Sequence, residues 1–546
     1  MGTSPFFARS GSSPVLAALV FLFGLALFLP GAGARSFWGN DENRYAVVAR
    51  HMAEDGGSFS LLELHGEPYA EKPPFLFWCV TASSRLLGGL DERSARLPVA
   101  VFGALTLVVT HLFAGAAIGA RAALVAPVLL GGAGEFFWLS RRLAFDPILA
   151  FFETAAAFSF FLGFERGSRR AFFAAFAAMA LGILTKGPVG LVVPLLGAVA
   201  FAVVSGPRSL LKEVPWIRGS VIVVAVLAVW LVPAALEGGA GFLKRLVVDQ
   251  QVGRTTGELG HTKPLTFYLE AFPAGFLPWT PLLAAAPFLA RAFRAGPERR
   301  GVAFAAAWFV AGFVFFSLVK TKRNLYLIPL YPAAALLAAA ALDAGMRGAA
   351  GRRLSALVAS YPAALLAACG AGGIAAPFVL PRLLPVSAGQ ALLAFALAGV
   401  PALAGFALFL RRRGGDLVAL AATVLGCGLF SGLVLLPARD GAESNAGLAR
   451  AVAAMMAPGD RLVAYRIQPD ELLFYTGLRE VVKADGPEAL ERLRGAPERL
   501  VVVAEDRHEA EVRAAFGDEA AEVARTPGDL GGVASAKDIL HVFVTR

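Results

Sequence analysis

Charged residues are scarce in this chain of 546 residues. Asp, Glu, Lys and Arg together make up 16%, where a soluble protein would carry about a quarter. A helix needs about 20 apolar residues to cross the roughly 30 Å hydrocarbon core of a bilayer, and runs of this kind recur from residue 14 to residue 436. The composition therefore excludes an ordinary soluble globular protein and indicates a membrane protein that crosses the bilayer many times.

Cysteine is also rare. Cys79, Cys369 and Cys427 are far apart and lie within or beside apolar runs, so they form neither a metal-binding spacing nor a disulfide framework. The net charge of +10 would suit nucleic acid, but many basic residues occur in short loops between apolar runs, as membrane topology requires. We therefore expect no nucleic-acid partner.

Thirteen apolar runs predict thirteen membrane-spanning helices. They cover residues 14–34, 97–118, 121–140, 146–163, 170–186, 188–204, 217–236, 267–290, 302–318, 326–343, 355–376, 389–410 and 417–436. The basic loops 166–170, 208–218, 291–300, 347–353 and 411–413 should face the cytoplasm. With the amino terminus inside, an odd number of spans places the tail outside. The first run also resembles a secretory signal, because it follows Arg9 and ends in small residues; the many later spans favour a retained helix.

A shorter apolar run, residues 73–87, is left out of this count. It has 15 residues including Arg85, which is short for a span, and counting it would reverse the side of every later loop. We predict an interfacial or re-entrant helix within a long first periplasmic loop, residues 35–96.

The composition changes after residue 436, which divides the chain into a membrane domain, residues 1–436, and a tail domain, residues 437–546. Short apolar β-type runs at 461–465, 500–504 and 539–544 alternate with helical patterns at 487–493 and 509–516. This alternation predicts a small α/β domain. The tail has no GxGxxG and no P-loop, so we expect it to cover or position a site rather than to perform chemistry.

Polar residues collect on the predicted outer side of the membrane. They lie in the stretches Trp38–Tyr45, Tyr69–Pro74, 238–266 and Lys320–Tyr326, with Asp146 and Lys186 at outer span ends. Cations on this side break the positive-inside tendency; they are Arg44, Lys72, Lys186, Lys320, Lys322 and Arg323. Either these side chains reach lipid headgroups, or they bind an anionic ligand, since Lys and Arg both suit phosphate.

Two acid–base juxtapositions stand out in the first loop. Asp41 and Glu42 come shortly before Arg44, and Glu71 is next to Lys72. A carboxylate beside cations at the membrane boundary can stay ionised and accept a proton from an attacking hydroxyl. The alternative is a pair of surface ion pairs, each contributing about 0–1 kcal/mol. The spacing of these residues does not distinguish a catalytic carboxylate from a surface ion pair.

These stretches resemble a known superfamily, the membrane glycosyltransferases related to protein O-mannosyltransferases. The motifs are Asp41–Ala46 (DENRYA) and Tyr69–Pro74 (YAEKPP), with further matches at Ser140–Pro147, Leu184–Pro188, Lys320–Pro332 and Glu471–Gly477. The match is best with the bacterial aminoarabinose transferases, which modify lipid A. The resemblance implies the GT-C fold, an all-α membrane bundle of about 13 spans, with a periplasmic α/β tail.

The resemblance also implies roles for residues. Asp41 would be the catalytic base, or would hydrogen-bond an acceptor that is already ionised, and Glu71 would be a second catalytic residue, which also shapes the pocket. The residues expected to hold the lipid-linked phosphate or to surround its pocket are Arg44, Tyr45, Tyr69, Lys72, Asp146, Lys186, Lys320 and Tyr326. His261 is a candidate acid–base or metal contact. Arg323 and Asn324 stand where aminoarabinose transferases tend to have a proline-containing stretch. Because of this difference, the resemblance does not identify the sugar that is transferred.

The implied activity is transfer of a sugar, with inversion, from a polyprenyl (undecaprenyl) phosphate carrier to lipid A, another glycan or a protein. It would take place at the periplasmic face of a bacterial inner membrane. No metal is required in principle, although a divalent ion is compatible. A transporter or flippase for lipid-linked sugars is the alternative, but it should show repeat symmetry between its halves, and we find none. A non-catalytic assembly or sensor protein is a third reading, which leaves the periplasmic polar cluster unexplained.

Overall fold

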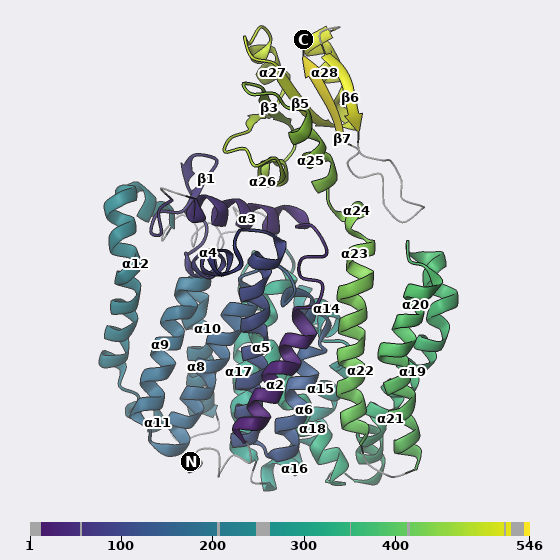
Figure 1. The fold of residues 1–546 in the computed structure, drawn as a ribbon. Helices are drawn as coiled ribbons and strands as arrows, with labels where there is room; N and C mark the ends of the chain where they lie inside the picture. Colours follow the sequence, from purple (N-terminus) through teal and green to yellow (C-terminus); the bar gives the residue numbers. More distant parts are fainter. Residues whose placement is uncertain are drawn as a thin grey trace.

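The computed structural model describes residues 13–54, 57–204, 208–246, 262–296, 298–349, 351–411, 415–517, 520–525 and 540–545. Most of these residues form a helical bundle, and a small mixed domain stands on one end of it (Figure 1). The bundle helices are α2 (Pro14–Phe28), α5 (Glu92–Ala117), α6 (Ala120–Gly131), α7 (Gly134–Leu139), α8 (Asp146–Arg166), α9 (Arg169–Lys186), α10 (Val189–Val204), α12 (Trp216–Lys244), α14 (Phe267–Gly275), α15 (Thr280–Ala285), η2 (Ala286–Leu289), α17 (Arg299–Leu318), η3 (Asn324–Leu330), α18 (Tyr331–Met346), α19 (Arg352–Leu383), α20 (Ala388–Ala394), η4 (Phe395–Gly399), α21 (Val400–Leu410), α22 (Asp416–Phe430), η5 (Ser431–Leu435) and α23 (Leu436–Ala438).

The predicted polytopic bundle is confirmed, and each of the thirteen predicted spans falls on a helix or a run of helices. Among the described residues, eight helices are long and apolar enough to cross a membrane, or nine if a bent pair counts as one span. The other four predicted spans are the shorter helices α2, α6, α9 and α10, of 15, 12, 18 and 16 residues. A helix of 12 residues spans only about 18 Å. Helix length and apolarity therefore support eight or nine of the thirteen predicted spans among the described residues.

The predicted span 267–290 is a broken helix rather than a continuous one. Helices α14 and α15 with η2 form a pair bent by 118°. Pro273, Pro278 and Pro281 fall in and around the break. Proline lacks the amide hydrogen that a continuous helix requires and clashes with the preceding turn, so apolarity alone could not reveal the bend.

Helices at the edge of the bundle expose apolar side chains. On α12, Ile217 is 83% exposed and Leu236 is 82% exposed, and on α19 Phe378 is 69% exposed. In water such faces would be costly, at roughly 25 cal/mol for each Å² of apolar surface. Lipid contact removes this cost, so the outer faces are those of a multi-pass membrane protein.

The first loop is more structured than predicted. Helix α4 (Phe75–Leu87) occupies the predicted interfacial segment and ends at Gly88, which has the left-handed backbone (φ 83°) common after a helix. The structure adds helix α3 (Gly39–Ala53) and the two-residue strands β1 (Glu63–Leu64) and β2 (Glu67–Pro68). Helix α3 lies across the end of the bundle (Figure 1).

The tail contains the predicted α/β fold. Its five-stranded sheet has the order β4 (Val482–Ala484), β3 (Arg461–Tyr465), β5 (Leu500–Glu505), β7 (Leu540–Thr545) and β6 (Ala520–Arg525). Strands β4, β3 and β5 are parallel, whereas β7 and β6 are added antiparallel. The tail helices are α25 (Ala446–Met455), α26 (Asp470–Thr476), α27 (Pro487–Leu493) and α28 (Glu509–Phe516). Prediction missed β4 and β6, which are respectively very short and alanine-rich.

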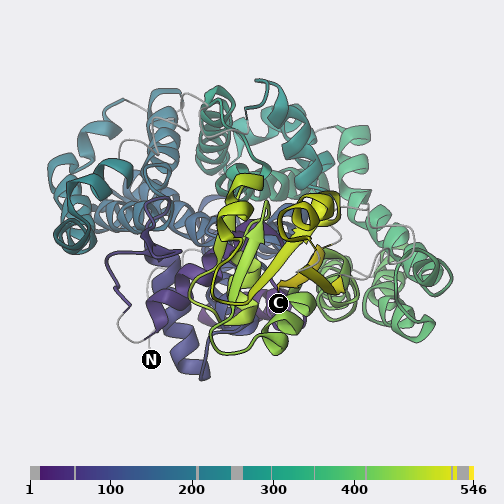
Figure 2. The ribbon, with the colours of Figure 1, turned by 90° about the horizontal axis from the view of Figure 1, so that it is seen from above.

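The tail rests on the first loop. From above, it lies over the amino-terminal elements (Figure 2), and α26 packs against α3. The Arg50 guanidinium of α3 donates to the carbonyls of Leu473 at 2.9 Å and Leu478 at 2.6 Å. The Tyr475 hydroxyl accepts from the Phe37 amide at 2.8 Å. Asp440, in the short helix α24 (Asp440–Glu443), accepts from the Ser36 amide and the Trp38 indole.

Candidate functional site

A cavity of about 590 Å³ opens where α3 meets the ends of the bundle helices; we call it the α3 cavity. Its lining combines charged groups with apolar side chains such as Leu139, Phe145 and Leu325. The charged lining residues are Asp41, Glu42, Arg44, Glu71, Lys72, Arg142, Asp146, Lys186 and Arg323. Segments almost 300 residues apart in the sequence thus contribute to one site.

Helix α3 presents one face to this cavity. Asp41, Arg44 and Tyr45 are three and four residues apart, so they project from the same side of the helix. Glu42, the next residue after Asp41, also borders the cavity but is only 1% exposed, because its carboxylate pairs with the buried Arg35 and Arg96. Tyr45 is packed edge-to-face against Phe145 and Phe77, which fixes the helix relative to α8 and α4.

Asp41 is paired with a residue from a distant part of the chain. Arg323, which precedes η3, donates from Nη2 to Asp41 Oδ2 at 2.7 Å. Burial alone would raise the pKa of the Asp41 carboxyl, but the positive charges of Arg323, Lys72 and Arg44 outweigh it and hold the pKa below its ordinary value. Asp41 is therefore ionised at neutral pH.

Arg44 and Glu71 form a second ion pair in the cavity lining. Arg44 Nη1 lies 3.4 Å from Glu71 Oε2, and the Tyr69 hydroxyl lies 3.5 Å from the same oxygen. Lys72 follows Glu71 and lines the cavity, where its charge lowers the pKa of Asp41. The first-loop motifs therefore converge on one place.

The inner end of the cavity holds a buried ion pair. Lys186, at the end of α9, donates a hydrogen bond to Asp146 at the start of α8. Lys186 Nζ also lies 5.0 Å from the centre of the Tyr326 ring, a distance suited to cation–π attraction. Lys186 thus has both an anionic and an aromatic partner.

Glu42 is the centre of a second, buried cluster beneath α3. Its carboxylate accepts from Arg35 at 2.9 Å and Arg96 at 3.1 Å, and lies 3.6 Å from Arg142. It also accepts from the amides of Trp38 at 2.9 Å and Leu143 at 2.8 Å. Burial alone would raise the pKa of Glu42, but the guanidinium groups outweigh it and hold the pKa far below its usual range. This cluster anchors α3 to the bundle.

The predicted site residues have four different outcomes in the structure. Those that line the α3 cavity are Asp41, Arg44, Tyr45, Glu71, Lys72, Asp146, Lys186 and Tyr326. Tyr69 is buried behind Glu71, and Lys320 is exposed and is not a lining residue. His261 lies outside the described residues. Prediction did not assign Arg323 and Arg142 to the site; Arg323 was visible as one of the unexpected outer cations.

A second cavity, also of about 590 Å³, adjoins the first; we call it the hairpin cavity. It is lined by Leu64, His65, Glu67, Pro68, Tyr69, Ala70, Glu71 and Arg245. Glu71 belongs to both cavities. A single carboxylate therefore forms part of the wall between them.

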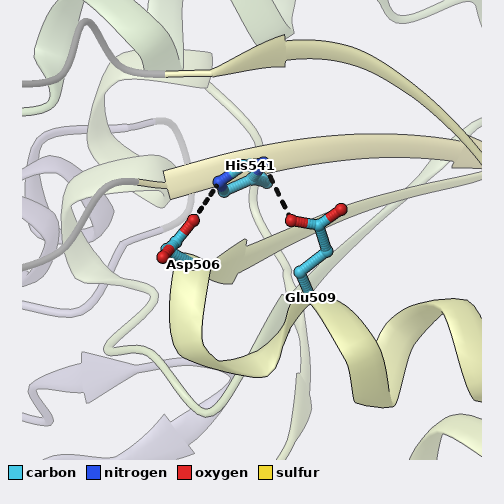
Figure 3. Close-up of side chains that lie close together, drawn as sticks. All are labelled: Asp506, Glu509 and His541. Carbon is cyan, nitrogen blue, oxygen red and sulfur yellow. Dashed lines mark hydrogen bonds and ion pairs between the residues drawn. The ribbon is translucent and has the colours of Figure 1, made fainter.

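One group of side chains in the described part of the tail has the composition of a metal site. Asp506, Glu509 and the buried His541 place potential ligand atoms within 4.8 Å of one another (Figure 3). Both imidazole nitrogens of His541 already pair with carboxylates: Nε2 lies 2.9 Å from Asp506 and Nδ1 lies 3.0 Å from Glu522. Arg513 also pairs with Glu509 and Glu522. The group is a satisfied polar network of the tail, and we assign no metal to it.

Sequence comparison finds proteins that are similar to part of this chain. Residues 71–232 match the family model described as "Dolichyl-phosphate-mannose-protein mannosyltransferase". An uncharacterised protein of Aquifex aeolicus is 28% identical over 322 residues, 59% of this chain and 62% of that protein. An undecaprenyl phosphate-α-4-amino-4-deoxy-L-arabinose arabinosyl transferase of Proteus mirabilis is 28% identical over 57% of each chain. The matches thus span about 60% of the length of these curated relatives.

Structural comparison covers nearly the whole chain. ArnT from Cupriavidus metallidurans, in a crystal structure with bound undecaprenyl phosphate, matches with a TM-score of 0.77, 24% identity and 97% coverage of both chains. The Archaeoglobus fulgidus oligosaccharyltransferase matches with a TM-score of 0.54 and 13% identity over 90% of this chain and 69% of that chain. These likenesses concern the fold. Together with the sequence matches, they confirm the resemblance and the GT-C fold class predicted from the motifs.

Proposed function

We propose that this chain, a relative of the protein O-mannosyltransferase-like superfamily with the GT-C fold, transfers a sugar from a polyprenyl-phosphate carrier to an acceptor. One observation carries the proposal: Asp41 shares a cavity with Arg44, Lys72 and Arg323 at the end of a membrane bundle. The ArnT structure of the same fold contains undecaprenyl phosphate, which we take as the carrier class for this chain.

The cavity offers what such a carrier needs. Lys72, Arg44 and Arg323 supply cations for a phosphate. Leu139, Phe145 and Leu325 supply an apolar lining for the isoprenoid units next to that phosphate. When the bond between the sugar C1 and the phosphate oxygen breaks, the electron pair stays on the phosphate, and cations already in place stabilise the growing negative charge.

Asp41 is the proposed acceptor-activating group. The acceptor oxygen attacks C1 from the side opposite the phosphate, its proton passes to Asp41, and the single displacement inverts the anomeric centre. A carboxylate with a lowered pKa is a weak base. It therefore suits the hydroxyl of a phosphate monoester, whose second pKa is about 6, better than an alcohol. This favours a phosphate-bearing glycan acceptor such as lipid A.

We propose the periplasmic side of a bacterial inner membrane for this reaction. The basic segment 208–218, which contains α11 (Leu210–Glu213), and the basic helix α16 (Ala290–Ala295) lie at the end of the bundle opposite α3 and the tail (Figure 1). Arg300 and Arg347, at neighbouring loops, pair there with Glu165 and Glu298. The positive-inside rule then assigns that end to the cytoplasm and the α3 cavity to the outside.

Binding of the carrier tests the proposal directly. Purified protein in lipid nanodiscs should bind undecaprenyl phosphate, and Lys72→Met should weaken binding about 10- to 100-fold, because a charge-assisted hydrogen bond is worth about 1.5–3 kcal/mol. Lys320→Met is the matched control; it removes an exposed lysine outside the cavity and should leave the Kd unchanged. Equal losses in both variants, or no binding by the parent protein, would refute the site.

The pH dependence of transfer tests the role of Asp41. The acidic limb that belongs to Asp41 should lie below the ordinary range of a carboxyl group, because Asp41 must be ionised and the surrounding cations lower its pKa. In Arg323→Gln the cation is lost while burial remains, so this acidic limb should move to higher pH. Rate–pH profiles of both proteins provide the measurement; a limb that does not move contradicts the assignment.

A further inference from the structure

The tail contributes one carboxylate that reaches the walls of both cavities. Asp470 is the first residue of α26, and its side chain is 2% exposed. Its Oδ2 lies 3.4 Å from Arg44 Nε, and its Oδ1 lies 2.8 Å from His65 Nε2. Arg44 lines the α3 cavity and His65 lines the hairpin cavity. Asp470 therefore connects two first-loop segments that border different cavities.

These contacts restrain the Arg44 guanidinium on two sides. Asp470 holds Nε, and Glu71 lies 3.4 Å from Nη1. Within the described residues Nη2 has no hydrogen-bond partner, so it remains as a donor for an anion in the cavity. A guanidinium with two fixed nitrogens loses little conformational freedom when an anion binds, and such preorganisation increases affinity.

His65 is the second residue that Asp470 contacts, and it lies in a tight turn. It occupies the turn between β1 and β2 with a φ of 55°, followed by Gly66 at 76°. Positive φ at both central residues is what a two-residue type I′ hairpin turn requires, so the turn itself accounts for this backbone. The contact between the His65 ring and Asp470 holds this turn against the tail.

Docking of the tail does not depend on Asp470 alone. Arg50, Tyr475 and Asp440 make separate hydrogen bonds between the tail and the first loop. None of these three residues lines either cavity. Removing the charge of Asp470 should therefore leave the tail in place and change the restraint on Arg44.

We infer that Asp470 is a positioning residue that makes the tail part of the phosphate-binding site by orienting Arg44 toward the α3 cavity. The inference rests on the proposed function, because it assigns the cavity to the phosphate of a polyprenyl carrier. It extends the predicted role of the tail, from a domain that covers or positions the site to one that supplies a named charged contact.

The test compares two acidic residues of the tail. In nanodiscs, Asp470→Asn should raise the Kd for undecaprenyl phosphate about tenfold. Asp440→Asn also removes a charge at the docking surface and should change the Kd less than twofold. Both variants should keep the parent melting temperature. Unchanged or tighter binding by Asp470→Asn overturns the inference, since tighter binding would mean that Asp470 only competes for Arg44.

A double-mutant cycle separates positioning from a general effect of the substitution. In the Arg44→Met background, Asp470→Asn should weaken binding no further; a full tenfold additional loss contradicts action through Arg44. If Asp470→Asn folds poorly, Asp470→Glu keeps the charge but displaces it by one methylene, and should raise the Kd about threefold. Absence of binding by the parent protein is a different result, and refutes the proposed function itself.

Discussion

Replacing Asp41 by Asn should lower the rate of sugar transfer by about 10²–10⁴-fold, the usual contribution of a positioned proton acceptor. The variant should still bind undecaprenyl phosphate at least as tightly as the parent protein. The reason is that Arg323, 2.7 Å from Asp41 in the parent, loses its anionic partner and becomes available to the phosphate. Transfer assays and carrier-binding measurements on purified protein give the two quantities.

Glu54→Gln is the control for this substitution. Glu54 immediately follows α3, pairs with Arg50 and Arg479, and does not line the cavity, so transfer should be unchanged. Cells that carry Asp41→Asn should accumulate the lipid-linked sugar, and mass spectrometry of that lipid would identify the donor. Full activity of purified Asp41→Asn, together with no accumulation, would remove Asp41 from the mechanism.

Replacing Glu42, the residue after Asp41, should reduce the stability of the protein rather than act on the transfer reaction itself. Glu42→Ala should lower the free energy of unfolding by about 3–5 kcal/mol, because it leaves Arg35 and Arg96 buried without their anionic partner. These arginines are 3% and 1% exposed, so water does not replace the lost contacts. The amides of Trp38 and Leu143 also lose their acceptor.

Thermal unfolding in detergent, followed by the fraction of protein that remains monodisperse, measures this effect. Asp41→Asn is the natural comparison, since it changes the neighbouring carboxylate, which is 35% exposed, and should shift the melting temperature only slightly. Similar melting temperatures for Glu42→Ala and Asp41→Asn would show that the buried cluster does not hold α3. Loss of carrier binding without loss of stability in Glu42→Ala would lead to the same conclusion.

The contrast between Asp41 and Glu42 marks a limit of the sequence. Both are acidic, both lie in the first turn of α3, and both occur in one motif. Successive helical residues are rotated by about 100°, so Asp41 points toward the cavity and Glu42 toward the buried arginines. The packing of the surrounding helices decides which face of α3 borders the cavity and which is buried. The motif could therefore predict a site and could not distinguish its two carboxylates.

The sequence by itself determined the features that depend on local composition. Apolar runs predicted the positions of the bundle helices, and charge placement predicted that Asp41, Lys72, Asp146 and Lys186 would collect at one end. Local patterns also predicted tail helices 487–493 and 509–516, which match α27 and α28. Helix formation and membrane crossing follow from neighbouring residues, so they can be read along the chain.

Only the tertiary structure decided which charged side chains pair with one another. It joined Asp41 to Arg323, 282 positions away, and Arg44 to Asp470, 426 positions away. It also bent the segment 267–290 and placed Lys320 outside the cavity. An ion pair is effective only over a few ångströms, and the distance between two side chains depends on how whole helices pack rather than on the residues beside them in the sequence.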